Sequence, residues 1–209
     1  MMHPAFEAFS TSILSVLDIA GTAVFAVSGA LAAARERLTI LTFMFFAAIT
    51  GVGGGTVRDL LIGAPVAWMH NSAGITVCMV CALLVWFTPG HLWSERAVDW
   101  FDGMGIAAYG VYGSAKAIAY GIPLIPAALM GIVSACMGGI FRDVLAGVPS
   151  IIIRPELYVT AVALSSCSYV LLTAAGLPTT LAAAIAITAG FALRALALIK
   201  GLGLPHYRK

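Results

Sequence analysis

The sequence is poor in charge. Asp, Glu, Lys and Arg together make up 10% of its 209 residues, and the formal net charge is +2. A soluble domain carries about a quarter charged residues, so this chain has too little polar surface to cover a globule in water. Hydrophobic residues make up 61% of it, and its mean hydropathy is +1.03. The composition therefore predicts an integral membrane protein, and the small net charge argues against a nucleic-acid partner.

Cysteine is also scarce, and the four cysteines, Cys78, Cys81, Cys136 and Cys167, all lie in apolar segments. The first two have CxxC spacing, but no second pair and no neighbouring histidine accompanies them, as a zinc site would require. We interpret the cysteines as small packing residues on membrane helices. Residues 1–12 contain no Lys or Arg, which a signal peptide needs, so we expect the first apolar segment to be a retained helix.

Seven segments are long and apolar enough to cross a bilayer as helices, which takes about 20 residues each. In chain order they are 13–34, 39–63, 70–90, 99–118, 122–147, 157–175 and 179–199. Positive residues lie between alternate spans, at Arg35, Arg96 and Arg154, and again after the last span at Lys200, Arg208 and Lys209. Because cytoplasmic loops carry the excess of Lys and Arg, we predict an all-α membrane fold with the N-terminus outside and the C-terminus in the cytoplasm.

The first half of the chain matches the second half at one constant offset, without a gap. Residues 54–65 read GGTVRDLLIGAP and residues 138–149 read GGIFRDVLAGVP. Each copy holds three spans, an odd number, so the second copy enters the membrane from the opposite side. We therefore predict one transmembrane domain over 1–209, built from repeat 13–90, an inverted repeat 99–175 and a seventh helix at 179–199.

Four of the charged residues inside apolar spans fall at matching depths. From the helix rise, Asp18 and Arg58 lie at one level near the outer boundary, and Asp102 and Arg142 lie at one level near the inner boundary. We predict two ion pairs, Asp18–Arg58 and Asp102–Arg142. Such pairs either hold helices together, at about 0.6 kcal/mol for each polar bond, or guard a water-filled path. Their repetition beside glycine-rich segments favours gates.

Three further charges belong to the same set. Asp59 and Asp143 directly follow the two arginines and point about 100° away around each helix, so their partners stay unassigned. Lys116 breaks the repeat, because Ala32 occupies the matching position, and it is expected in the outer half of its helix. Snorkelling to the interface and tuning the field of a pore are equal alternatives for Lys116.

The glycine-rich segments predict interruptions of the second and fifth helices. Three consecutive glycines are poor helix formers and remove side chains from every face, more than close packing requires. A break frees backbone carbonyls, which can replace part of the hydration shell of a cation. Hydroxyl groups just before each break would add oxygens. The predicted hinge and ion path consist of Gly53, Gly54, Gly55, Gly138, Gly139, Thr50 and Ser134.

At the motifs GGGTVRD and GGIFRDV, the sequence resembles the prokaryotic members of the trimeric intracellular cation (TRIC) channel family, which are related to bacterial glycine-transporter-type proteins with a duplicated domain. The resemblance covers nearly the whole chain. It implies a multi-pass homotrimer in the cytoplasmic (inner) membrane of a prokaryote, in contact with lipids that it can bind. It also implies a pore in each protomer for monovalent cations, chiefly K⁺ with Na⁺ as a second candidate, lined by helices two and five.

The resemblance implies no cofactor and no structural metal, since K⁺ is only in transit. The second motif has Met137 where the first has Gly53, so its break is expected to be milder. A secondary transporter of a small solute such as glycine remains the alternative to a channel, because inverted repeats and broken helices also suit alternating access. We do not expect an enzyme, because no HExxH motif occurs and no serine or cysteine has a credible base beside it.

Overall fold

The computed structural model describes residues 15–94 and 96–205. Its helices are α2 (Ser15–Arg35), α3 (Ile40–Leu61), α4 (Ala67–His70), α5 (Ala73–Phe87), η2 (Gly90–Leu92), α6 (Ala97–Ala119), α7 (Leu124–Leu145), η3 (Ile151–Ile153), α8 (Val159–Ala174) and α9 (Thr179–Lys200). The predicted all-helical class is confirmed. The first two residues of the span predicted over 13–34, and the basic residues Arg208 and Lys209, lie outside the described residues.

Seven of these helices lie where the seven spans were predicted. Four of them, α2, α3, α7 and α9, are long and apolar enough to cross a membrane, and α5 and α8 are shorter apolar helices. Helix α6 is 23 residues long but carries Asp99, Asp102 and Lys116. These lengths and compositions indicate a multi-pass membrane protein. The seven crossings and the orientation of the termini stay predictions.

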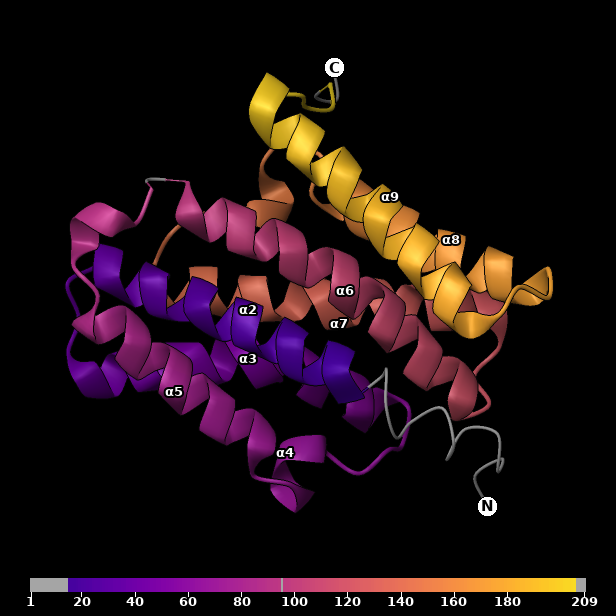
Figure 1. The fold of residues 1–209 in the computed structure, drawn as a ribbon, viewed down its shortest axis with the longest axis horizontal. Helices are drawn as coiled ribbons and strands as arrows, with labels where there is room; N and C mark the ends of the chain where they lie inside the picture. The colour runs from indigo at the N-terminus through magenta and orange to yellow at the C-terminus, as the bar shows by residue number, and fades with distance from the viewer. Residues whose placement is uncertain (1–14, 95, 206–209) are drawn as a thin grey trace.

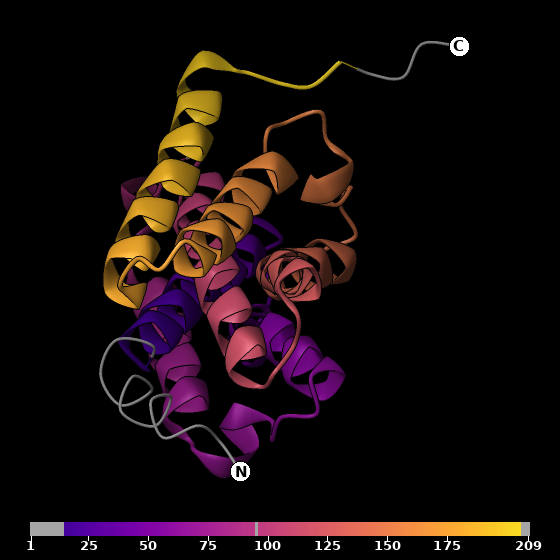
Figure 2. The ribbon, with the colours of Figure 1, turned by 90° about the vertical axis from the view of Figure 1, so that its right-hand side faces the viewer.

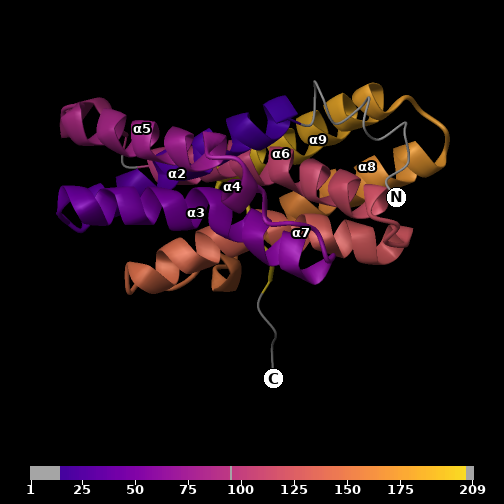
Figure 3. The same cartoon turned by 90° about the horizontal axis from the view of Figure 1, so that it is seen from below.

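The long helices run side by side along the longest axis of the molecule (Figure 1). Helix α2 packs against α3, α5 and α6, while α7 packs against α3, α6 and α8. Helix α9 covers α6 and α8 on the outside of this group. Figure 2 shows α8 and α9 on one side of the molecule and α4 and α5 on the opposite side, and Figure 3 shows α3 and α7 adjacent when seen from below. Each half thus presents its first two helices to the other half.

Helices α3 and α7 end in the same way, because the repeated motif includes a glycine after the Arg-Asp pair. Gly63 and Gly147 have φ values of +69° and +68°, which glycine adopts without strain. The backbone N–H of the next residue donates to the carbonyl of Asp59 or Asp143, at 2.8 and 3.0 Å respectively. This is the Schellman arrangement of a helix C-terminus. This C-terminal arrangement ends each helix within one turn of its Arg-Asp pair and directs the chain away from the helix axis.

Helices α3 and α7 continue unbroken through their glycine-rich segments. A Cβ atom at Gly54 would overlap the carbonyl oxygen of Ser134, and one at Gly138 would overlap the carbonyl oxygen of Thr50. The predicted interruption of the two helices is therefore wrong. The physical reason is that these glycines let two backbones approach closely at a helix crossing, a contact between distant segments that the local sequence does not reveal.

Candidate functional site

Two clusters of charged and hydroxyl-bearing side chains lie inside the bundle, on either side of the α3–α7 crossing. We name them after the predicted sides of the membrane. The outer cluster consists of Asp18, Thr22, Arg58, Asp59, Tyr109, Tyr112 and Lys116. The inner cluster consists of Ser28, Asp102, Arg142, Asp143 and Tyr158. The two clusters occupy corresponding positions in the two halves of the chain.

The inner cluster contains the predicted ion pair between Asp102 and Arg142. Arg142 Nη1 lies 2.5 Å from Asp102 Oδ1. Ser28 Oγ donates to the same carboxylate oxygen at 2.8 Å, and the Tyr158 hydroxyl donates to Asp102 Oδ2 at 3.2 Å. Asp102 is 0% exposed, so both of its oxygens are held by protein donors. The geometry of this pair is as predicted, while its role as a gate stays a prediction.

The two unassigned acids bind the arginines that precede them. Arg58 donates from Nε to Asp59 Oδ1 at 2.9 Å, and its Nη2 lies 2.7 Å from that oxygen. Arg142 binds Asp143 Oδ1 with the same two nitrogens at 2.9 and 2.7 Å. The backbone N–H of Ala67, or of Ile151 in the second half, donates to the other carboxylate oxygen. A long arginine side chain can fold back along its helix, which the angular separation of the Cα atoms did not anticipate.

Lys116 joins the outer cluster from α6. Its Nζ lies 2.8 Å from Asp59 Oδ1, and the lysine and aspartate side chains are 12% and 1% exposed. Lys116 is therefore at the level of Arg58, in the half of the molecule where it was expected. Of the two alternatives, its burial against Asp59 favours a role inside the bundle over snorkelling to the interface.

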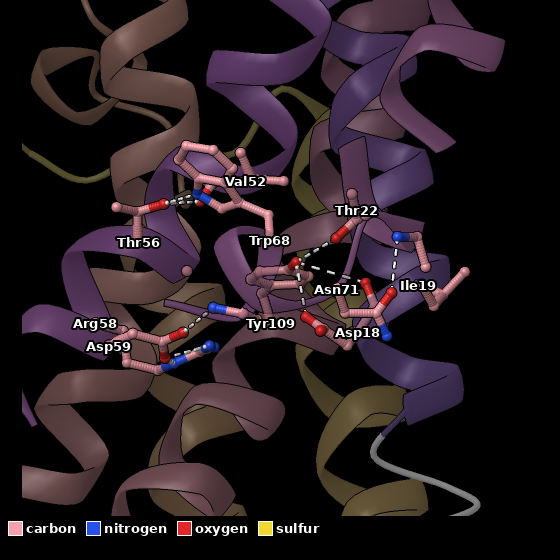
Figure 4. A pocket seen from close by; sticks show the side chains of 14 residues that line it. Asp18, Ile19, Thr22, Val52, Thr56, Arg58, Asp59, Trp68, Asn71 and Tyr109 are labelled. Atoms are coloured by element: carbon pink, nitrogen blue, oxygen red, sulfur yellow. Dashed lines mark hydrogen bonds and ion pairs between the residues drawn. The ribbon is translucent and has the colours of Figure 1, made fainter. Parts of the chain in front are cut away.

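Asp18 does not form the predicted ion pair with Arg58. Among residues 15–94 and 96–205, the ion pair of Arg58 is with Asp59, and the guanidinium lies 4.7 Å from the centre of the Tyr112 ring. The Tyr109 hydroxyl donates to Asp18 Oδ1 at 3.1 Å. The prediction is wrong because Asp59 and an aromatic face already satisfy the arginine. Figure 4 shows Asp18 on one side of Tyr109 and the Arg58–Asp59 pair on the other.

Both clusters border a pocket, but Asp18 lines the outer one, whereas the matching inner acid, Asp102, is fully buried. Asp18, Thr22, Arg58 and Tyr109 lie on the wall of the outer pocket (Figure 4). Asp18 is only half-buried, in contrast to the fully buried Asp102. Two repeat-related carboxylates thus have different surroundings: one faces a pocket and the other is enclosed by hydrogen-bond donors.

The hydroxyl groups predicted to line the path lie between the two clusters. Ser134 Oγ accepts a hydrogen bond from Arg58 Nη1 at 3.3 Å. Thr50 is buried, and its Oγ1 has no hydrogen-bond partner among the described residues. A buried hydroxyl without a protein partner is unusual and costs free energy unless water or an ion satisfies it. Thr50 Oγ1 is therefore a buried polar atom in the middle of the bundle that the described side chains leave unsatisfied.

The remaining predicted glycines lie against the same clusters. A Cβ at Gly139 would come within 3.0 Å of the Tyr158 hydroxyl and 3.3 Å of Asp102 Oδ2, and one at Gly55 would come within 3.5 Å of Arg58 Nη2. A Cβ at Gly53 would come within 2.8 Å of the Phe141 ring. These glycines leave room for the charged side chains and for a ring of the opposite helix.

Sequence reasoning missed the tyrosines and the serine that bind the two acids. Tyr109 and Tyr158 have no polar counterpart at the matching positions of the other half, where Phe25 and Gly74 stand, and Ser28 matches a residue of a different type, Tyr112. The internal repeat therefore gave no signal for them. Tyr109 could have been noted because it lies two helical turns beyond Asp102, facing the bundle that the repeat predicts.

The chain matches a family model described as "Glycine transporter" over residues 15–89 and 99–174. It is 39% identical over 160 residues to a UPF0126 membrane protein of Vibrio cholerae, which covers 74% of this chain and 66% of that protein. It is 38% identical over 151 residues to the UPF0126 inner membrane protein YadS of Escherichia coli, covering 69% of this chain and 72% of that protein.

The fold is similar to that of the TRIC trimeric intracellular cation channel orthologue from Rhodobacter sphaeroides. The TM-score is 0.85 and the sequence identity is 36%, over 92% of this chain and 100% of that chain. None of these descriptions is that of an enzyme.

Proposed function

Because the chain belongs to the glycine-transporter family and has the fold of a TRIC channel orthologue, we propose that it is a channel for monovalent cations, chiefly K⁺. The resemblance predicted from the two glycine-then-Arg-Asp motifs is confirmed. The proposal includes a homotrimer with one path in each protomer, since the Rhodobacter sphaeroides protein is named trimeric. It also includes the inner membrane of a bacterium, where the Escherichia coli relative is named as located.

We propose further that the chain is an inverted repeat of 13–90 and 99–175 followed by a seventh helix. The contacts support this proposal, because α2 packs on α6 and α3 packs on α7, as a two-fold axis between the halves requires. The hydrogen bonds from Ala67 to Asp59 and from Ile151 to Asp143 correspond in the same way. The N-terminus outside follows from the distribution of Lys and Arg.

One observation carries the channel proposal: charged and hydroxyl groups lie at several levels inside an apolar bundle. We propose that they form a line, from the half-buried Asp18 past Ser134 and Thr50, whose hydroxyl has no partner among the described residues, to the inner pair of Asp102 and Arg142. Burying charges among apolar helices is expensive. Pairs that only joined helices would not need a carboxylate that opens to a pocket at one end of the line.

The geometry supports the ion pairs as the predicted gates and gives no support to the predicted glycine hinge. The glycines form a close crossing of α3 and α7 that leaves little room for bending. The inner pair, in contrast, closes the end of the polar line with side chains, which can change rotamer without moving a helix. Conduction would then require Arg142 to release Asp102 while keeping its bond to Asp143.

Cation flux from liposomes tests this proposal. Purified protein in vesicles loaded with KCl is expected to release K⁺ at a rate that rises in proportion to the K⁺ gradient. Asp18→Asn, which removes the negative charge at the pocket, is expected to lower the rate severalfold. Vesicles that release no K⁺ above the protein-free level would contradict the proposal.

The second candidate is a transporter of a small solute such as glycine. The open outer pocket and the sealed inner acid favour it, since alternating access leaves a central site open to one side at a time. The description of the family model agrees. Uptake of radiolabelled glycine that saturates with concentration and depends on an ion gradient would favour this candidate over the channel.

A further inference from the structure

The inner cluster is connected to a part of the chain that lies outside the two repeats. Arg194 of α9 is 0% exposed, and its Nη2 lies 2.8 Å from Glu156 Oε2. The same guanidinium lies 5.3 Å from the centre of the Tyr158 ring. Helix α9 therefore contacts, through one arginine, two residues of the segment 155–158 that leads into α8.

The segment after α9 also contacts residues 155–158, through its backbone. The backbone N–H of Leu204 donates to the carbonyl of Pro155 at 2.7 Å, and Glu156 forms an isolated β-bridge with Gly203. Figure 2 shows the chain leaving α9 across the loop that precedes α8. Main-chain bonds and an ion pair with a buried arginine together fix the position of this short segment.

Tyr158 connects the fixed segment 155–158 to the inner ion pair. It is 0% exposed, and its hydroxyl donates to Asp102 Oδ2, the oxygen that Arg142 does not use. A donor at this oxygen keeps the carboxylate turned so that Oδ1 faces the guanidinium. Tyr158 thus acts on the pair through Asp102, as a positioning residue.

The outer half has no counterpart of this arrangement. The positions that match Glu156 and Tyr158 are Ser72 and Gly74. The tyrosine that donates to Asp18 is Tyr109 of α6, which does not belong to the segment that matches 155–158. Among the described residues of the first half, no helix matches α9. Both halves carry the same Asp and Arg, yet only the inner pair is closed. The difference between them must therefore come from residues outside the match.

We propose that α9 and the segment 201–205 hold the inner ion pair closed by fixing Tyr158 against Asp102. This inference rests on the proposed role of the Asp102–Arg142 pair as a gate and adds what keeps that gate shut. Movement of α9 or of the segment after it would then release the pair.

The test measures how readily a reagent reaches the inner cluster, without any need for a current. Ala32 lies on the wall of a pocket beside Arg142 and Asp143, so Ala32→Cys reports access to them. Of the four native cysteines only Cys167 is exposed, and it is replaced by serine in every variant. The reporter is labelled with a membrane-impermeant maleimide in vesicles, against a parent without Ala32→Cys.

Tyr158→Phe removes one hydroxyl and keeps the ring. Loss of a hydrogen bond to a charged group shifts an equilibrium by about tenfold, so we expect the labelling rate to rise about tenfold. Tyr169→Phe, a change at another buried tyrosine, on α8 and outside the inner cluster, is the control and should leave the rate unchanged. Glu156→Gln, which breaks the ion pair with Arg194, should raise the rate in the same direction.

An unchanged rate in Tyr158→Phe overturns this inference, as does an equal rise in Tyr158→Phe and Tyr169→Phe, which would show general loosening. The outcomes separate the two proposals. A raised rate in a protein that passes no current supports the control of the inner pair and overturns the channel. Currents with an unchanged labelling rate support the channel and overturn this inference.

Discussion

Replacing Gly54 with alanine tests the close crossing of α3 and α7, on which the two clusters depend. The added Cβ would overlap the backbone carbonyl of Ser134, and a backbone atom cannot swing away as the end of a side chain can. The two helices must therefore move apart before the new methyl group fits. Overpacking of this kind costs about 1–3 kcal/mol, against a gain of up to about 1 kcal/mol from the better helix former.

Gly55→Ala is the matched control, one residue further along the same helix. Its Cβ would lie 3.5 Å from Arg58 Nη2, an ordinary contact, so only the gain in helix propensity applies and stability should stay equal or rise. Thermal unfolding in detergent, followed by circular dichroism, compares the two. We expect Gly54→Ala to lower Tm by several degrees and Gly55→Ala not to lower it. Equal Tm values for both variants would show that the crossing is not tight and refute the reasoning.

Three further predictions concern the charges. Arg58→Ala should change open probability or conductance more than stability, because Asp59 retains its ion pair with Lys116. A variant that is less stable but gives normal currents would show that the Arg58–Asp59 pair only stabilises the fold. Lys116→Met should cost about 1 kcal/mol in thermal unfolding, since Asp59 keeps Arg58, and a loss several times larger would contradict this sharing. Asp102→Asn weakens the hold on Arg142, so the open probability should rise in single-channel recordings, and an unchanged value would count against the inner pair as a gate.

The sequence predicted most of the fold because two of its signals can be read without knowing any contact between helices. Apolar segments of about 20 residues located the helices, and the repeated Arg-Asp motif related α3 to α7 and placed Arg142 beside Asp102. Both signals depend on residue type and spacing alone. The match between segments 54–65 and 138–149 singled out α3 and α7 as equivalent helices, and the structure adds that these two helices pack together.

The rest depended on contacts between distant segments. A run of glycines suits both a hinge and a close crossing, and only the position of the Ser134 carbonyl distinguishes the two for Gly54. The partner of Arg58 depended on its side-chain conformation, which depth along a helix does not determine. The contact of Arg194 with Glu156 links α9 to the loop before α8, and neither residue has a repeat partner that would have drawn attention to it.

Single-channel recording in a planar bilayer tests the central claim most directly. Purified protein in a gradient of KCl is expected to give discrete unitary currents that reverse near the equilibrium potential of K⁺. Asp18→Asn should reduce their amplitude, because it removes the charge that faces the outer pocket. Solute flux that saturates at low turnover, without unitary currents under any gradient, would contradict the account and leave the transporter in its place.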